Sequence, residues 1–149
     1  MNRHQLALKG LLLAAIPVLV IATLERALAQ TKGEKPVSAL VTDVQGVETD
    51  VKNLLFYWEE KVSETAFVPH EQRLVPVKRG TATINVKFEH IRSIEIGPGP
   101  DSGPPLFTIT LTNGKSGEFP LAIAGSFKGE SDFGDLTIPA TNVRRILVK

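Results

Sequence analysis

The residues FEHIRSIEI (88–96) and ATNVRRILV (140–148) follow nearly the same pattern, and this pattern determines the fold that the sequence predicts. In both segments the first residue and the residues three, six and eight positions later are apolar, and Arg92 and Arg144 occupy the same place. Apolar residues three apart are typical of one tight helical turn, whereas apolar residues two apart are typical of a strand. The pattern therefore predicts a strand, one tight turn and a last strand, with Ile91 and Val143 facing a core and both arginines facing solvent.

The similarity extends further when the second half of the chain is aligned with the first. With a shift of 52 residues the apolar positions of 84–96 coincide with those of 136–148, and with a shift of 68 the segment 41–55 coincides with 109–123. The first copy therefore has 16 additional residues between its two matching parts. We interpret this as an internal duplication of a β unit. The alternative is two unrelated β segments that share only their alternation.

Strand signals dominate the rest of the sequence after residue 36. Apolar and polar residues alternate at 84–89 and again at 107–112, and the second run ends at Asn113-Gly114, which favours a hairpin turn. The best helical candidate, 43–55, fits a hairpin around Gln45-Gly46 at least as well. Residues 97–105, GPGPDSGPP, hold four prolines and three glycines and predict a loop or linker.

The expected fold is thus all-β: two related β-meander units, 37–96 and 106–149, that form a small sandwich or tandem SH3-like barrels. The tight turn before the last strand of each unit resembles the end of a small SH3-like or Sm-like barrel. The chain as a whole resembles small exported bacterial β-domain proteins, and this resemblance implies no activity. We expect one shared core, because the second unit of about 45 residues is marginal for independent stability.

The N-terminal residues 1–29 have the three parts of a secretory signal peptide. A basic start precedes an apolar segment at 11–24, and the small residues Ala27 and Ala29 predict cleavage before Gln30. The alternative is an uncleaved anchor, but fourteen apolar residues are fewer than the roughly 18 to 20 that a spanning helix needs. We therefore expect a periplasmic or secreted protein without a membrane span, in which 30–36 is a flexible leader.

Charge and composition exclude several classes of function. The signal segment accounts for three of the 17 basic and one of the 16 acidic residues, so the remainder carries a net charge of about −1. Such a chain has no overall positive field for binding nucleic acid. The absence of cysteine excludes disulfides, thiol chemistry and thiolate metal sites.

The 16 additional residues fall in the most distinctive region, the aromatic insertion at 56–76. It holds the only tyrosine and the only tryptophan of the chain, and it predicts a ligand- or partner-binding site formed by Tyr57, Trp58, Phe67 and His70. Aromatic side chains are frequent anchors at binding surfaces because they bury a large area at little entropic cost. The alternative is that the segment is a long hairpin whose aromatic residues pack on the core.

No reaction signature accompanies this region. His70 and His90 lack the spacing of a metal site, and neither a nucleophile motif nor a phosphate-binding loop is present, so we expect no metal and no cofactor. Carboxylates near Glu71, or from Glu130 to Asp135, leave open a small periplasmic hydrolase. The favoured hypothesis is a non-catalytic binding or structural module of the cell envelope, whose partner is an envelope protein or glycan.

Overall fold

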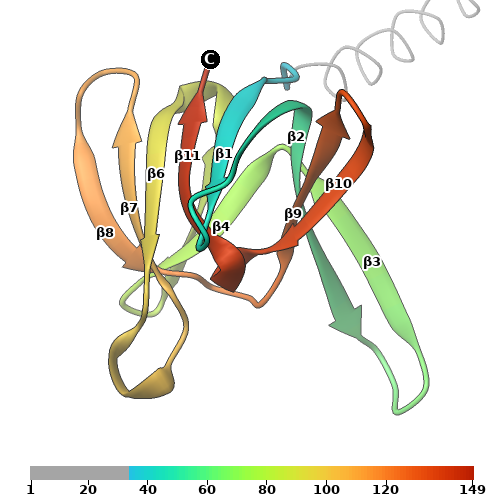
Figure 1. Cartoon of the computed structure of the whole chain (residues 1–149). Helices are drawn as coiled ribbons and strands as arrows, with labels where there is room; N and C mark the ends of the chain where they lie inside the picture. The colour runs from blue at the N-terminus through green and yellow to red at the C-terminus, as the bar shows by residue number, and fades with distance from the viewer. Residues whose placement is uncertain (1–33) are drawn as a thin grey trace, which may run out of the picture. The chain divides into compact units, whose positions relative to one another are not determined.

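The computed structural model describes residues 34–149, of which Lys35–Lys149 form one compact unit (Figure 1). The expected signal peptide, 1–29, and the first part of the leader lie outside the described residues. Within residues 34–149 no helix has the length and apolar character needed to cross a membrane.

The described part of the chain is all-β, as the alternation predicts. Its first strands are β1 (Ala39–Asp43), β2 (Glu48–Lys61), β3 (Phe67–Gln72), β4 (Leu74–Arg79), β5 (Ala82–Lys87) and β6 (Ile91–Gly97). They are followed by β7 (Leu106–Leu111), β8 (Ser116–Pro120), β9 (Ser126–Ser131), β10 (Gly134–Pro139) and β11 (Val143–Val148). The only helices here are short 3₁₀ turns: η1 (Phe88–His90), η2 (Pro100–Ser102) and η3 (Ala140–Asn142). Both tight turns expected from the repeated pattern are thus present, as η1 and η3.

The strands form an open sheet in the order β10-β9-β2-β1-β11-β6-β7-β8, with β3 also beside β2 and a separate β4-β5 pair (Figure 1). The expected alternative of tandem closed barrels is wrong. The sheets are not closed, and the first strand of each predicted unit pairs with the last strand of the other, β1 with β11 and β7 with β6. The two halves are therefore joined by continuous backbone pairing.

The last strands of the two predicted units, β6 and β11, pair with each other, and Ile94 lies opposite Ile146. These two residues are 52 positions apart, the shift found in the sequence. The elements β4, β5, η1 and β6 recur as β9, β10, η3 and β11, and each starts 52 residues after its counterpart. The same succession of elements therefore occurs twice along the chain, and each time it ends in one of these two paired strands.

A single core cluster fills the space that the bent sheet encloses. Its largest fully buried side chains include four phenylalanines: Phe56, Phe88, Phe107 and Phe127. Ile91 and Val143 are buried and Arg92 and Arg144 are exposed, as the repeated pattern predicts. The other members of the cluster come from both halves of the chain: Ala39, Val41, Val51, Leu54, Val75, Val77, Ile94, Ile109, Leu121, Ala140 and Ile146.

Candidate functional site

The aromatic insertion forms a two-stranded arm, made of the second half of β2, the turn 62–66 and β3. Figure 1 shows this arm extending beyond the other strands at one side of the molecule. Strand β2 departs from regular pairing at Asn53, which has a positive φ of 53° and lies where the register with β9 shifts. The side chain of Arg73 donates a hydrogen bond to Oδ1 of Asn53 (3.2 Å). A bulge of this kind bends a strand and lets it leave one sheet for another.

Strand alternation divides the four predicted site residues between the two faces of the arm. Trp58 lies opposite His70 in the β2–β3 register, and both side chains are on one face. Tyr57 and Phe67 occupy odd-numbered positions and are on the other face. The structure therefore places all four on one hairpin but does not bring them into a single cluster.

The face that holds Trp58 is continuous with the core. The Trp58 ring is 5.9 Å from the Phe56 ring and stacks on the imidazole of His70, with centroids 5.1 Å apart and an interplanar angle of 14°. Nε2 of His70 lies 2.9 Å from a carboxylate oxygen of Glu60. Trp58 is half-buried and packs against the core cluster, so it has a structural role whether or not the arm binds a partner.

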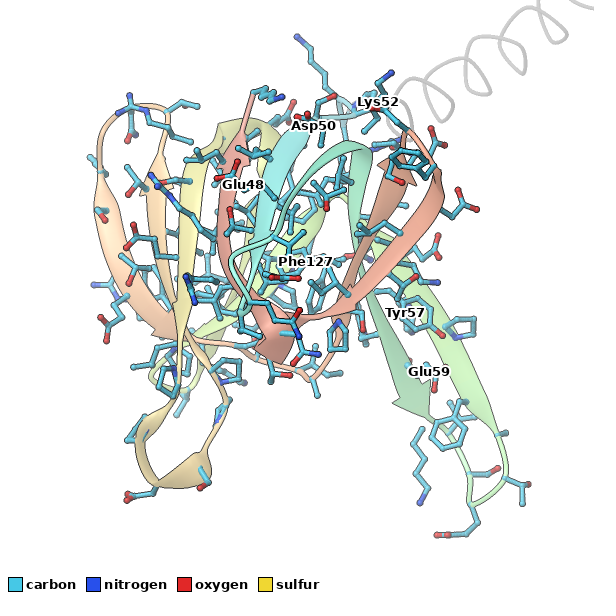
Figure 2. All side chains as sticks on the ribbon, viewed as in Figure 1. Glu48, Asp50, Lys52, Tyr57, Glu59 and Phe127 are labelled. Atoms are coloured by element: carbon cyan, nitrogen blue, oxygen red, sulfur yellow. The ribbon has the colours of Figure 1, made fainter. Side chains whose placement is uncertain are left out.

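The opposite face carries a polar network around Tyr57. Its hydroxyl donates to Oε1 of Glu59 (2.6 Å), and Figure 2 shows both residues on the arm. The ammonium group of Lys128, on β9, lies 4.0 Å from the centre of the Tyr57 ring and 3.3 Å from a carboxylate oxygen of Glu71. The hydrogen bond to Glu59, with lesser contributions from desolvation and from the charges of Glu59 and Glu71, raises the pKa of Tyr57. The network ties the base of the arm to β9.

The tip of the arm is apolar and exposed. Every residue from 59 to 69 is exposed, and the exposed fractions of Val62, Phe67 and Val68 are 57%, 54% and 40%. Of the other large exposed apolar residues of the described chain, Val44 and Val47 share the β1–β2 turn, whereas Ile123 and Phe133 lie singly in the β8–β9 loop and the β9–β10 turn. The arm is therefore where exposed apolar side chains gather.

The carboxylates of the hydrolase hypothesis come together although they are far apart in sequence. Glu71, Glu130 and Asp135 line one cavity of about 310 Å³, together with Lys128. The ion pair with Lys128 occupies one oxygen of Glu71. Within residues 34–149 no group of three or more His, Cys, Asp or Glu side chains is arranged to hold a metal ion.

Comparisons of this chain with protein-family models, with curated proteins and with solved structures found no match.

Sequence reasoning missed Lys128, Val62 and Val68 as parts of this surface. Lys128 is 57 positions from Glu71 and is brought to it only by the pairing of β9 with β2. The two valines are ordinary strand residues in the sequence. Knowledge of the β2–β3 register would have identified them, since it places Lys61 opposite Phe67 and leaves 62–66 as the tip.

Proposed function

We propose that this protein is an exported, non-catalytic binding module of the cell envelope that contacts a protein partner through the tip of the β2–β3 arm. The signal-like residues 1–29 support export to the periplasm or the medium. Val62 at the turn, with Phe67 and Val68 on opposite faces of β3, provides the apolar part of the contact. The exposed charged residues Glu59, Glu64 and Lys61 around them provide a polar rim, as protein interfaces usually have.

The observation that carries this proposal is the gathering of three exposed apolar side chains at the end of a projecting hairpin. Exposed apolar residues that lie together mark interaction surfaces, whereas isolated ones are ordinary. The arm is also held in place before binding. The Trp58–His70 stack supports one face of its base, and the Lys128–Glu71 ion pair supports the other. A preorganised hairpin loses little entropy on binding, which favours recognition by this element.

Photocrosslinking tests the proposal with a matched control within the chain. A photoreactive amino acid replaces Val68 at the arm tip or, in the control, Phe133, which is fully exposed in the β9–β10 turn. In intact envelopes we expect a discrete product from position 68 and none from position 133. Equal labelling from both positions would contradict the proposal.

The identified partner is then purified and its affinity measured. Phe67→Ala should weaken binding about tenfold, the size expected for an interface anchor of about 1.4 kcal/mol. Phe133→Ala removes the same side chain from an exposed site outside the arm and should leave the affinity unchanged. An unchanged affinity for Phe67→Ala, with the fold intact, would remove the arm tip from the interface.

We also infer that the module consists of two related β units, 37–96 and 106–149, whose first hairpins are exchanged. The common shift of 52 residues and the pairing of Ile94 with Ile146 support this inference. An experimental structure in which the backbone of 74–97 failed to superpose on that of 126–149 would contradict it.

A small hydrolase is the second candidate, because Glu71, Glu130 and Asp135 share one cavity. Incubation with envelope polymers tests this candidate directly. A binding module releases no product. Turnover that is lost in Glu71→Gln and Glu130→Gln, but kept in the control Glu95→Gln on β6, would instead favour the hydrolase.

A further inference from the structure

A second surface, remote from the arm in the strand order, combines a free strand edge with a basic groove. Strand β5 pairs only with β4 among residues 34–149. The N–H of Ala122 donates to the carbonyl oxygen of Pro76 (3.0 Å), so the backbone of Pro76 is directed away from β5. Its partner Asn85 therefore belongs to a non-hydrogen-bonded pair. By alternation, the N–H and C=O groups of Thr83, Asn85 and Lys87 point to the open edge.

Among the edge strands of the described chain, β5 is distinguished by the absence of proline. Strand β3 contains Pro69, β8 contains Pro120 and β10 contains Pro139. Proline cannot donate to a ladder, and its presence at an edge discourages pairing with another strand. At the position 52 residues before Pro139, β5 has Lys87. The edge of β5 is therefore the one able to offer an uninterrupted set of donors and acceptors.

A groove with a volume of about 460 Å³ adjoins this edge, between β5 and the β7–β8 hairpin. Apolar side chains from all three strands line it: Ile84, Val86, Ile109, Leu111 and Phe119. The Phe119 ring lies close over Gly117, where a Cβ atom would come within 2.7 Å of the ring. Glycine at this position thus allows the aromatic ring to cover the strand. The groove offers apolar contact to a segment that pairs with β5.

The charged residues that line the groove are all basic or potentially basic: Arg79, Lys87, His90 and Lys115. Glu89 lies 3.9 Å from His90 but is not part of the lining. Within residues 34–149, Arg79, Lys87 and Lys115 form no ion pair. The shift of 52 places Ser131, Pro139 and Asn142 at the positions of Arg79, Lys87 and His90, and the shift of 68 places Val47 at the position of Lys115. The related half of the chain therefore lacks this charge, and its edge strand β10 is interrupted by Pro139.

We propose that this groove binds an extended acidic segment of a partner protein, which adds to the sheet as a strand beside β5. The free backbone groups of Thr83, Asn85 and Lys87 provide the ladder, and the apolar floor accepts alternate side chains. The positive charges of Arg79, Lys87 and Lys115 attract the carboxylates of the acidic segment and so favour it over neutral or basic segments. A second copy of this chain is disfavoured as the occupant, because two β5 edges would bring like charges together. The free backbone groups of β5 also favour a peptide over an anionic amphiphile, because only a peptide can form a ladder of backbone hydrogen bonds with them.

The test uses the chain without residues 1–29 and a short labelled peptide in which glutamate and valine alternate. Fluorescence anisotropy should detect binding that weakens as salt is added. The same peptide with lysine in place of glutamate should not bind. A peptide with N-methylated backbone amides should also fail, because it cannot form the ladder. Hydrogen exchange should slow at the amides of Thr83, Asn85 and Lys87 when the acidic peptide binds.

Charge-reversed variants locate the site. The double variant Lys87→Glu/Lys115→Glu should bind the acidic peptide at least about tenfold more weakly, as expected when two like charges replace two complementary ones. The control Lys52→Glu/Arg145→Glu changes the net charge equally at exposed positions outside the groove and should have little effect. Circular dichroism verifies the fold, and Lys87→Gln/Lys115→Gln replaces the first double variant if it does not fold.

Five results would overturn the proposal. Equal binding of the lysine peptide, or equal loss in both double variants, would show that the attraction is nonspecific. Undiminished binding of the N-methylated peptide would exclude strand addition. Binding of dodecanoate but not of the acidic peptide would assign the groove to an anionic amphiphile. A dimer in sedimentation that dissociates in Lys87→Glu/Lys115→Glu would assign it to a second copy of the chain.

Discussion

Phe127 and Phe133 lie on the same β9–β10 hairpin, yet truncation to alanine should lower the free energy of unfolding strongly at Phe127 and hardly at all at Phe133. Phe127 is fully buried, at the centre of the body in Figure 2, and its ring centre lies 5.4 Å from Phe56, 6.2 Å from Phe107 and 6.3 Å from Phe88. These contacts link strands of both halves of the chain. Loss of a buried Phe side chain costs about 3 to 5 kcal/mol, which includes the cavity that remains. We expect a loss of about 4 kcal/mol for Phe127→Ala, in the middle of this range.

The free energy of unfolding is measured by urea denaturation, with the fluorescence of Trp58, the only tryptophan, as the signal. A domain of this size has about 5 to 15 kcal/mol of stability, so Phe127→Ala should remain folded in water with a much lower midpoint. Phe133→Ala should change the free energy by less than about 0.5 kcal/mol, because its side chain is fully exposed. A loss below about 1 kcal/mol for Phe127→Ala, or equal losses for both variants, would refute this account of the core.

Two other predictions concern a close backbone contact and a titrating side chain. Gly129→Ala should destabilise the protein by about 1 to 3 kcal/mol, because its Cβ atom would lie 2.2 Å from Val51 and 2.8 Å from the backbone oxygen of Lys52. Gly97→Ala meets nothing within 4 Å, so similar urea midpoints for the two variants would contradict this reasoning. The ultraviolet titration of Tyr57, the only tyrosine, should have a midpoint above the ordinary value, and Glu59→Gln should lower it. Because the folded-state pKa is raised, the hydrogen bond to Glu59 stabilises the fold below the ordinary tyrosine pKa, and this contribution is lost as the pH rises through the folded-state value. A midpoint that Glu59→Gln leaves unchanged would show that this hydrogen bond is not the cause.

Local patterns predicted the local structure of the described chain. Alternation at 107–112 gave β7, and Asn113-Gly114 gave the turn that follows, where Gly114 has a φ of 89°. Gly46 likewise turns the β1–β2 hairpin, so a hairpin and not a helix begins the segment 43–55. The partners of the strands were not predictable in this way, because alternation records which face of a strand is buried but not which strand lies beside it. Hence the pairing of β1 with β11 appears only in the structure.

The same limit applies to the candidate sites. Composition alone drew attention to Tyr57, Trp58, Phe67 and His70, and the structure places them on one arm. Alternation alone separates Tyr57 from Trp58, but the placement of His70 beside Trp58 depends on a register that the sequence does not state. The basic groove was missed altogether, since Arg79 and Lys115 belong to different hairpins and meet only because both border the space beside β5.

The pairing of β1 with β11 has a consequence for how the chain reaches its native state. Strand β1 needs β11, and Ala39 pairs with Val148, almost the whole length of the described chain away. A polypeptide delivered from its N-terminus can form the β1–β2 hairpin early, but the other edge of β1 stays unpaired until the last residues arrive. Contacts this distant in sequence slow folding, because a long loop closes before they form. The native pairing of this edge is therefore completed only when the first and the last strand of the described chain are present together.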